Sequence, residues 1–167
     1  ILPLQGYGLR GVLWYQGESN ADNVEVHERL FPLLEKSWRK FFGRTDLPFY
    51  FVQLSSIGTR PSWPHFRDSQ RRMAASLPHT WMTVCSDLGD SLDVHPTHKR
   101  EVAERLAVSA LCHTYHHQVV PSGPQYKNFV CKGNTVILHF DYAQGLHAAH
   151  GNQLIGFELA GADGMYH

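Results

Sequence analysis

The sequence predicts an α/β protein, in which a parallel β-sheet is covered on both faces by helices and is followed by a β-rich tail. Through the first 118 residues, short apolar runs alternate with amphipathic segments in the order β-α-β-α-β-α, which is typical of a three-layer α/β/α fold. The run at residues 47–54 is apolar almost throughout, as in strands buried on both faces. We therefore expect residues 1–118 to form the sheet domain and residues 119–167 to be a partial accessory domain or an extension of the sheet.

The first strand is expected at residues 11–16, and a helix is expected to start at Asp22 or Asn23. Apolar side chains then recur at helical spacing with charged residues between them; they are His27, Leu30, Phe31, Leu34, Trp38 and Phe41. Pro32 lies inside this pattern and predicts a kink or a break. Gly43 is a natural end for the helix.

Two further strand–helix pairs complete the predicted sheet. The strands are expected at residues 47–54 and 80–85. The helix between them is predicted at residues 63–77 and ended by Pro78. The last helix is predicted at residues 99–115, where apolar side chains again share one face.

The tail is predicted to contain strands only. Residues 129–131 and 135–140 are apolar and are separated by Lys-Gly-Asn, which predicts a β-hairpin. A further strand is expected at residues 154–160.

Composition and charge exclude two classes of partner. Hydrophobic residues make up 43% of the chain and charged residues 18%, and the formal net charge is zero, so the basic surface of a nucleic-acid-binding protein is not expected. No apolar run approaches the roughly 20 residues that a membrane-spanning helix needs. The first eight residues lack the basic and apolar regions of a signal peptide.

The histidines and cysteines do not have the spacing of a metal site. His113, His116 and His117 lie close together, but no Cys partner or His-Glu-x-x-His pattern accompanies them, so no metal is expected. The cysteines are too few and too scattered for a disulfide framework, and we expect them to be small buried side chains. They are Cys85, Cys112 and Cys131.

A polar loop, Gln-Gly-Glu-Ser-Asn, follows the first predicted strand at residues 16–20. Open α/β sheets bind their ligands in loops at the carboxyl ends of strands, and this loop has more hydrogen-bonding groups than a turn needs. The alternative is that Glu18, Ser19 and Asn20 only cap the following helix, since Ser and Asn are preferred capping residues.

A second polar loop follows the third predicted strand. His95 lies there, with Asp87, Asp90 and Asp93 shortly before it. A His that is oriented by a carboxylate is the general base of nucleophile–His–Asp hydrolases. The alternative is a solvated acidic loop that caps the helix beginning at Lys99.

Both loops resemble signatures of one family. Residues 14–20, Trp-Tyr-Gln-Gly-Glu-Ser-Asn, resemble the signature loop of the sialate O-acetylesterase family, a branch of the SGNH-type hydrolases. The second signature is similar to Asp-Leu-Gly-Asp at residues 87–90, Val-His-Pro at residues 94–96, and the later Lys99 and Arg105-Leu106-Ala107. Arg67 and Gln70 also fit the family. The resemblance spans residues 11–111, continues weakly at residues 156–160, and implies the SGNH/flavodoxin-like three-layer sheet.

The resemblance implies that His95 is the catalytic base, because the family's base precedes Pro. SGNH-type hydrolases usually have Asp three residues before this His, but here Leu92 takes that place. The orienting carboxylate is therefore open among Asp93, Asp90 and Asp87, with Asp93 preferred because its tether to His95 is short.

In the first loop, the resemblance implies that Gln16, Gly17 and Asn20 stabilise the oxyanion and that Glu18 orients the loop or a sugar hydroxyl. The serine of this loop, Ser19, is not the family's nucleophile. No metal or organic cofactor is implied.

The family's nucleophile is a Ser in a Gly-Gln-Ser-Asn type motif upstream of the first loop. This chain has no such motif, and none of the ten residues before Gly11 is Ser. We therefore expect the nucleophile to lie on a missing N-terminal portion of the same protein, and we expect the 167 residues alone to be nearly inactive.

The implied function is serine-type hydrolysis of acetyl esters on a sugar or glycan, in a secreted, periplasmic or lysosomal protein. Two alternatives remain. One is an acetyl-xylan esterase or another acyl esterase. The other is a non-catalytic carbohydrate-binding module in which aromatic side chains stack on sugar rings; these are Trp14, Tyr15, Trp63 and Trp81.

Overall fold

The computed structural model describes residues 1–148, 151 and 154–166. The chain divides into two compact units, residues 1–123 and 124–167, so the division falls a few residues after the one expected from the sequence. Within the described residues, no helix has the length and the apolar character that crossing a membrane requires.

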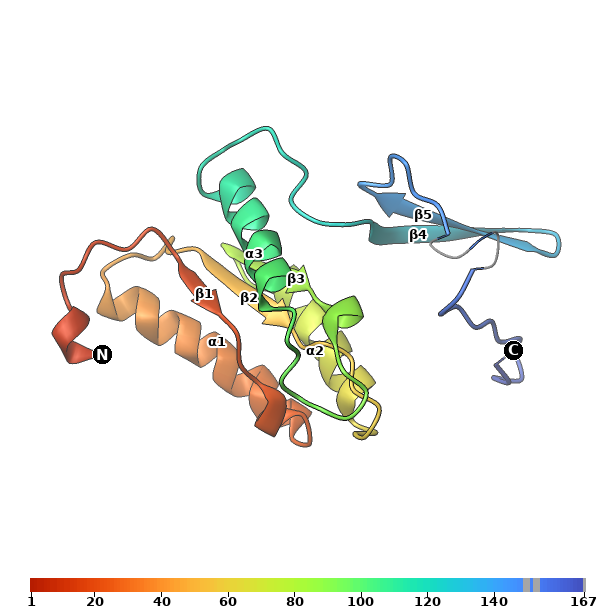
Figure 1. The fold of residues 1–167 in the computed structure, drawn as a ribbon, viewed down its shortest axis with the longest axis horizontal. Helices are drawn as coiled ribbons and strands as arrows, with labels where there is room; N and C mark the ends of the chain where they lie inside the picture. The colour runs from red at the N-terminus through yellow and green to blue at the C-terminus, as the bar shows by residue number, and fades with distance from the viewer. Residues whose placement is uncertain (149–150, 152–153, 167) are drawn as a thin grey trace. The chain divides into compact units, whose positions relative to one another are not determined.

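The first unit contains a three-stranded parallel sheet in the order β1-β2-β3 (Figure 1). The strands are β1 (Val12–Trp14), β2 (Phe49–Gln53) and β3 (Thr80–Val84). Every residue of β2 is buried, because β2 is the central strand and both of its faces are covered. This confirms the parallel sheet predicted from the apolar run at residues 47–54. Because the strands are parallel, their carboxyl ends lie at one edge.

Helices cover both faces of this sheet, as predicted. Phe51 of β2 packs with side chains from α1 (Val24–Phe41) and α2 (Trp63–Ser76). Tyr50, the neighbouring residue, faces the other way and packs with α3 (Lys99–His113). The described residues also form short 3₁₀ helices at Leu2–Leu4, Glu18–Asn20 and Ser86–Leu88.

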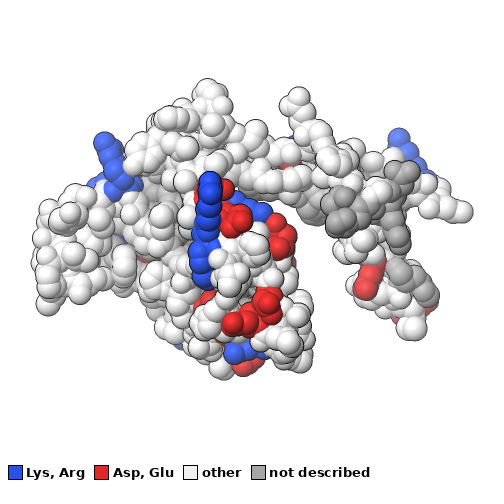
Figure 2. Space-filling model, viewed as in Figure 1, with Lys and Arg blue, Asp and Glu red and all other residues white. Residues whose placement is uncertain are grey.

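On the face of the molecule drawn in Figure 2, basic and acidic side chains lie next to one another in the middle of the view. Large areas around them carry neither charge. This mixture is in keeping with the formal net charge of zero.

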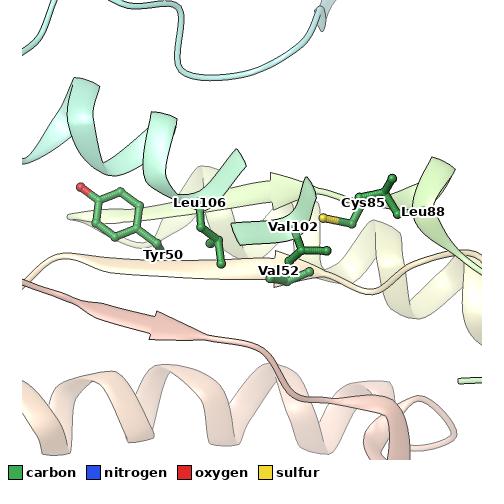
Figure 3. Packing of buried hydrophobic residues seen from close by; sticks show 6 residues of the cluster. All are labelled: Tyr50, Val52, Cys85, Leu88, Val102 and Leu106. Carbon is green, nitrogen blue, oxygen red and sulfur yellow. The ribbon is translucent and has the colours of Figure 1, made fainter. Parts of the chain in front are cut away.

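The core between α3 and the sheet is continuous and mainly apolar (Figure 3). Burial of this much apolar surface is the main favourable contribution to folding. Its members are Tyr50, Val52, Cys85, Leu88, Val102 and Leu106. Cys85 is thus a small buried side chain as expected, whereas Cys131, in the second unit, is exposed.

Helix α1 passes through Pro32 without a break. A proline in a helix interior removes one hydrogen bond and costs about 3 kcal/mol. Phe31 and Glu35, on either side of it, are both buried, and Phe31 packs edge-on against Phe51 of the sheet. Tertiary contacts on both sides of the proline therefore hold one continuous helix against the sheet.

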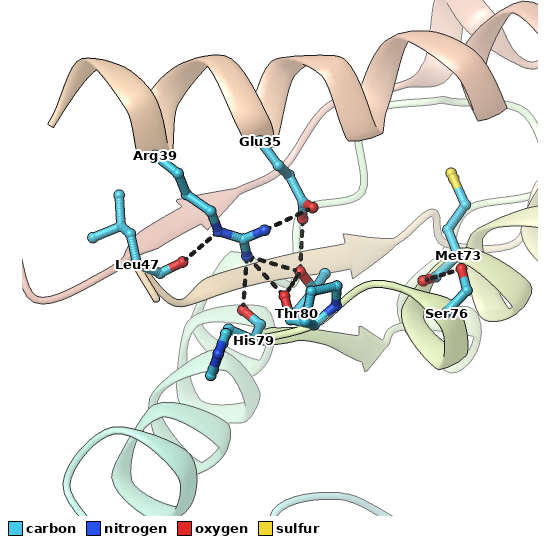
Figure 4. Close-up of polar contacts among 8 residues, drawn as sticks. Glu35, Arg39, Leu47, Met73, Ser76, His79 and Thr80 are labelled. Atoms are coloured by element: carbon cyan, nitrogen blue, oxygen red, sulfur yellow. Dashed lines mark hydrogen bonds and ion pairs between the residues drawn. The ribbon is translucent and has the colours of Figure 1, made fainter. Parts of the chain in front are cut away.

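A buried ion pair fixes the carboxyl-terminal half of α1 to the sheet (Figure 4). Arg39 donates hydrogen bonds to the carbonyl oxygens of Leu47 at 3.1 Å and Pro78 at 2.9 Å, just before β2 and β3 begin. Glu35 accepts a hydrogen bond from the Thr80 hydroxyl at 2.8 Å and lies 3.5 Å from Arg39. Burial raises the pKa of Glu35. These contacts stabilise the end of the sheet opposite the polar loops.

The second unit contains an antiparallel hairpin of β4 (Gln125–Lys132) and β5 (Thr135–Asp141), which confirms the predicted hairpin. The strand predicted at residues 154–160 is wrong, because only an isolated bridge from Ala160 to Tyr166 occurs there. Gly156 has a φ of 86°, which lies outside the extended region and interrupts a strand.

Candidate active site

Three loops meet at the carboxyl edge of the sheet, one after each strand. Together they line a small pocket. The lining includes Tyr15 and Glu18 from the first loop, Ser55 and Ile57 from the second, and Asp93 and Pro96 from the third. The fold therefore brings the two loops singled out in the sequence to one place, although about seventy residues separate them along the chain.

Hydrogen bonds between residues close in the chain stabilise the first loop. The Gly17 amide donates to Glu18 Oε2 at 3.1 Å, and the Gln16 side chain donates to Asn20 Oδ1 at 3.2 Å. The Asn20 amide donates to the Gly17 carbonyl at 2.9 Å. The Gly17 amide thus has a carboxylate oxygen as its acceptor.

Gly17 is required by the shape of this loop. Its φ of 140° is one that residues with a side chain rarely adopt. A Cβ at this position would also lie 3.2 Å from the ring of Phe66 on α2. The backbone of the first loop therefore lies close to the Phe66 ring of α2.

Helix capping does not explain the first loop. Helix α1 begins at Val24, and its N-cap residue is Asn23. Glu18, Ser19 and Asn20 instead form a separate 3₁₀ helix before that position. Their polar side chains are therefore not needed for the start of α1.

The third loop is organised by its acidic side chains. Asp90 Oδ1 accepts hydrogen bonds from the amides of Leu92 at 2.8 Å and Asp93 at 3.1 Å. These bonds lower the pKa of the Asp90 carboxyl. Asp93 Oδ1 accepts a hydrogen bond from the backbone amide of His95 at 2.8 Å. The side chain of His95 is exposed.

Asp87 has a different partner from the other two carboxylates. Its two oxygens each accept a hydrogen bond from Arg105 of α3 at 2.6 Å, and Arg105 also donates to the Val84 carbonyl at 2.9 Å. These bonds lower the pKa of Asp87. Asp87 and Arg105 therefore link the end of β3 to α3. Asp90 and Asp93, which are nearer to His95 in the chain, instead accept hydrogen bonds from the backbone of the third loop.

Two basic residues that sequence reasoning did not assign also contact the first loop. Lys99 at the start of α3 lies 4.5 Å from the centre of the Tyr15 ring and 3.4 Å from its hydroxyl. Arg60, in the second loop, donates to the carbonyl of Glu18 at 3.0 Å. For Arg60 the sequence carries no signal beyond its position after a predicted strand. Lys99 belongs to the second family signature, but that signature does not predict its contact with Tyr15.

Gln70 supports the end of the central strand. Its side chain is fully buried and accepts a hydrogen bond from the Leu54 amide at 3.0 Å. It also donates to the Val52 carbonyl at 3.3 Å. These bonds satisfy backbone groups at the point where β2 ends and the second loop begins.

Two of the aromatic residues proposed for sugar stacking, Trp63 and Trp81, pack in the core. Trp63 is buried and donates to the Ser55 carbonyl at 2.7 Å. Trp81 stacks between Tyr50 and His113, with ring centres 5.2 and 4.4 Å apart. Both rings pack against other side chains or the backbone of the core, so the binding-module alternative loses two of the four aromatic side chains on which it depended.

In the part of the chain that the structure describes, no group of three or more His, Cys, Asp or Glu side chains is arranged to hold a metal ion. Among the predicted site residues, Glu18 and Asp93 line the pocket, and His95 lies in the chain between two other lining residues, Val94 and Pro96.

Comparisons with known proteins identify the family of the chain. A family model described as carbohydrate esterase, sialic acid-specific acetylesterase, matches residues 4–112. The chain is 36% identical to the sialate O-acetylesterase of Mus musculus over 86% of its length, and 35% identical to that of Homo sapiens over 69%. It spans 31% and 26% of those proteins, respectively.

The same class appears among solved structures. A crystal structure of a carbohydrate acetylesterase from Xanthomonas citri matches with a TM-score of 0.86 and 38% sequence identity, over 99% of this chain and 40% of that one. The fold and the polar loops thus place the chain among the carbohydrate esterases. Within that class it belongs to the sialic acid-specific acetylesterase family, which confirms the resemblance seen in the two loops.

Proposed function

We propose that this chain forms part of the active site of a carbohydrate O-acetylesterase, which hydrolyses acetyl esters on a sugar. The observation that carries the proposal is the pocket in which Glu18 of the first loop and Asp93 of the third loop both take part. Sialic acid is the substrate class proposed first, because the matching family model is specific for it.

In this proposal the nucleophilic serine comes from an N-terminal portion of the same protein that lies outside these 167 residues. Its Oγ attacks the acetyl carbonyl while His95 takes the hydroxyl proton. The bond from the acyl carbon to the sugar oxygen then breaks, and His95 returns the proton to that oxygen. Water, activated by His95, hydrolyses the acyl-enzyme and releases acetate.

Asp93 is proposed to orient the imidazole of His95, with Asp90 as the second candidate. Asp93 Oδ1 accepts a hydrogen bond from the backbone amide of His95, which holds this carboxylate next to the residue whose ring it is proposed to orient. Asp90 Oδ1 accepts hydrogen bonds from two backbone amides, which ties this carboxylate to the loop and makes it the second candidate.

Gln16, Gly17 and Asn20 are proposed to donate to the oxyanion. The Gly17 amide supports this role, because its present acceptor is the negatively charged oxygen of Glu18 at 3.1 Å. When the oxyanion of the substrate replaces the Glu18 carboxylate as the acceptor, it receives the hydrogen bond of the Gly17 amide. Glu18 can then accept a hydrogen bond from a sugar hydroxyl. Donors fixed in advance stabilise the transition state most effectively.

The experiment is acetate release by the complete protein from O-acetylated sialic acid and, in parallel, from acetylated xylan. The proposal expects activity on the sialic acid ester that falls at least a hundredfold in His95→Ala, while a control at an exposed histidine, His117→Ala, retains it. Preference for xylan would instead assign the chain to the acetyl-xylan esterase alternative. As an enzyme acting on acetylated glycans, the complete protein is proposed to be secreted, periplasmic or lysosomal.

A further inference from the structure

The second loop, residues 55–62, lies between the two polar loops and is bonded to both. Toward the first loop, Arg60 donates to the Glu18 carbonyl at 3.0 Å. Two residues further on, the Ser62 hydroxyl donates to the Asp22 carboxylate at 2.7 Å. Both contacts hold the segment that contains the 3₁₀ helix Glu18–Asn20.

Toward the third loop, the same segment donates two backbone hydrogen bonds. The Gly58 amide donates to the Ser91 carbonyl at 3.0 Å, and the Ser56 amide donates to the Ser86 carbonyl at 3.4 Å. The backbones approach so closely that a Cβ at Gly89 would overlap the carbonyl oxygen of Ser56. The second loop is therefore bonded at two points to the loop that carries His95.

Arg60 is itself held in place. Its guanidinium lies over the ring of Trp63, 5.5 Å from the ring centre. Trp63 is buried and is bonded through its indole N–H to the Ser55 carbonyl. The second loop thus fixes Trp63, and the Trp63 ring supports the Arg60 guanidinium. These contacts restrict the movement of the guanidinium that donates to the Glu18 carbonyl.

We propose that the second loop, residues 55–62, sets the separation between the first loop and the third loop, which carries His95. Arg60 is the positioning residue on the side of the first loop. By holding the Glu18 carbonyl, Arg60 fixes the peptide unit between Glu18 and Ser19. This unit lies in the 3₁₀ helix that begins directly after Gly17, so Arg60 restrains the backbone next to the Gly17 amide. This inference rests on the proposed esterase function for its catalytic consequence. The fixing of the loop itself does not depend on that function.

The test compares two substitutions of similar length, Arg60→Met and Arg60→Lys, in the complete protein. Met keeps an apolar stem against Trp63 and removes the donor, whereas Lys keeps a charged donor. A displacement of about 1 Å at a catalytic group costs on the order of a hundredfold in rate. We therefore expect kcat for an acetyl ester to fall between roughly tenfold and a hundredfold in Arg60→Met, with KM nearly unchanged and kcat largely kept in Arg60→Lys.

Hydrogen exchange of the backbone amides at residues 17–21 provides a readout without catalysis. We expect faster exchange there in Arg60→Met than in the wild type or Arg60→Lys, and no change in Arg100→Ala, which alters an exposed residue of α3 paired with Glu104. Unchanged kcat and exchange in Arg60→Met, or equal losses in the Met and Lys variants, would overturn the inference. If the wild type releases no acetate, the proposed function fails and the exchange data alone decide the role of Arg60.

Discussion

The carboxylate of Asp93 accepts a hydrogen bond from the backbone amide of His95, 2.8 Å away. The side chain proposed to orient the catalytic ring is thus bonded to the main chain of the same residue. Asp90, three residues before it, accepts hydrogen bonds from the amides of Leu92 and Asp93. The two carboxylates therefore differ in their bonds to the loop: Asp90 accepts from two backbone amides, and Asp93 accepts from the amide of His95.

This difference predicts losses of kcat of different size for two isosteric substitutions in the complete protein. Asp93→Asn is expected to lower kcat by on the order of a hundredfold or more, because an amide does not stabilise the imidazolium. Asp90→Asn is expected to lower kcat only a few fold, with a lower melting temperature from the weakened loop. Steady-state kinetics and thermal unfolding check both; a larger kcat loss in Asp90→Asn would give the orienting role to Asp90.

Gly17→Ala should destabilise the first unit. Alanine at a φ of 140° is strained, and its Cβ would lie 3.2 Å from the Phe66 ring. We expect the free energy of unfolding to fall by about 1–3 kcal/mol, measured by urea denaturation of the chain. Gly123→Ala is the matched control, because its Cβ would meet open space; equal unfolding free energies in the two variants would contradict this account of the loop.

Removal of one partner from the buried pair of Figure 4 should be costly. Arg39→Met leaves the carboxylate of Glu35, a residue only 1% exposed, without its basic partner. Breaking such a pair costs about 3–5 kcal/mol, whereas Arg100→Met, at an exposed pair with Glu104, should cost less than about 1 kcal/mol. The comparison of the two unfolding curves measures the difference, and similar curves would contradict a stabilising role for Arg39.

Stability should also depend on pH through His27. The residue is 6% exposed, and its ring stacks on Phe66 with the ring centres 4.7 Å apart. Burial lowers its pKa from 6.5. The unfolded chain therefore binds a proton more readily than the folded chain, so this contribution to stability is lost as pH falls below about 6.5. Burial lowers the pKa of His113 in the same direction, whereas the raised pKa of Glu35 acts in the opposite direction above pH 4.5.

The substitution His27→Phe isolates the histidine contribution, because a phenyl ring keeps the stack and does not titrate. We expect the melting temperature of the wild type to fall more than that of His27→Phe between pH 7.5 and pH 5. Parallel curves for the two proteins would show that His27 does not titrate on unfolding.

The sheet and the meeting of the two loops could be predicted from local patterns. The apolar run of β2 indicates a central parallel strand, and parallel strands place Gln16 and His95 in loops at one edge. The contacts that hold these loops could not be predicted, because the Arg60–Glu18 and Asp87–Arg105 bonds join residues far apart in the chain. The prediction of a strand at residues 154–160 was wrong for a related reason, because apolar character alone does not supply a partner strand.

The most direct test of the central claim is the intact mass of the protein after treatment with a fluorophosphonate that labels activated serines. We predict no adduct on the 167-residue chain. On the complete protein we predict one adduct, on a serine N-terminal to these residues, that is lost in His95→Ala. An adduct on Ser19 or on any other serine of this chain would contradict the proposal. In that proposal the chain supplies the catalytic base, His95, and the oxyanion donors of the first loop, but not the nucleophile.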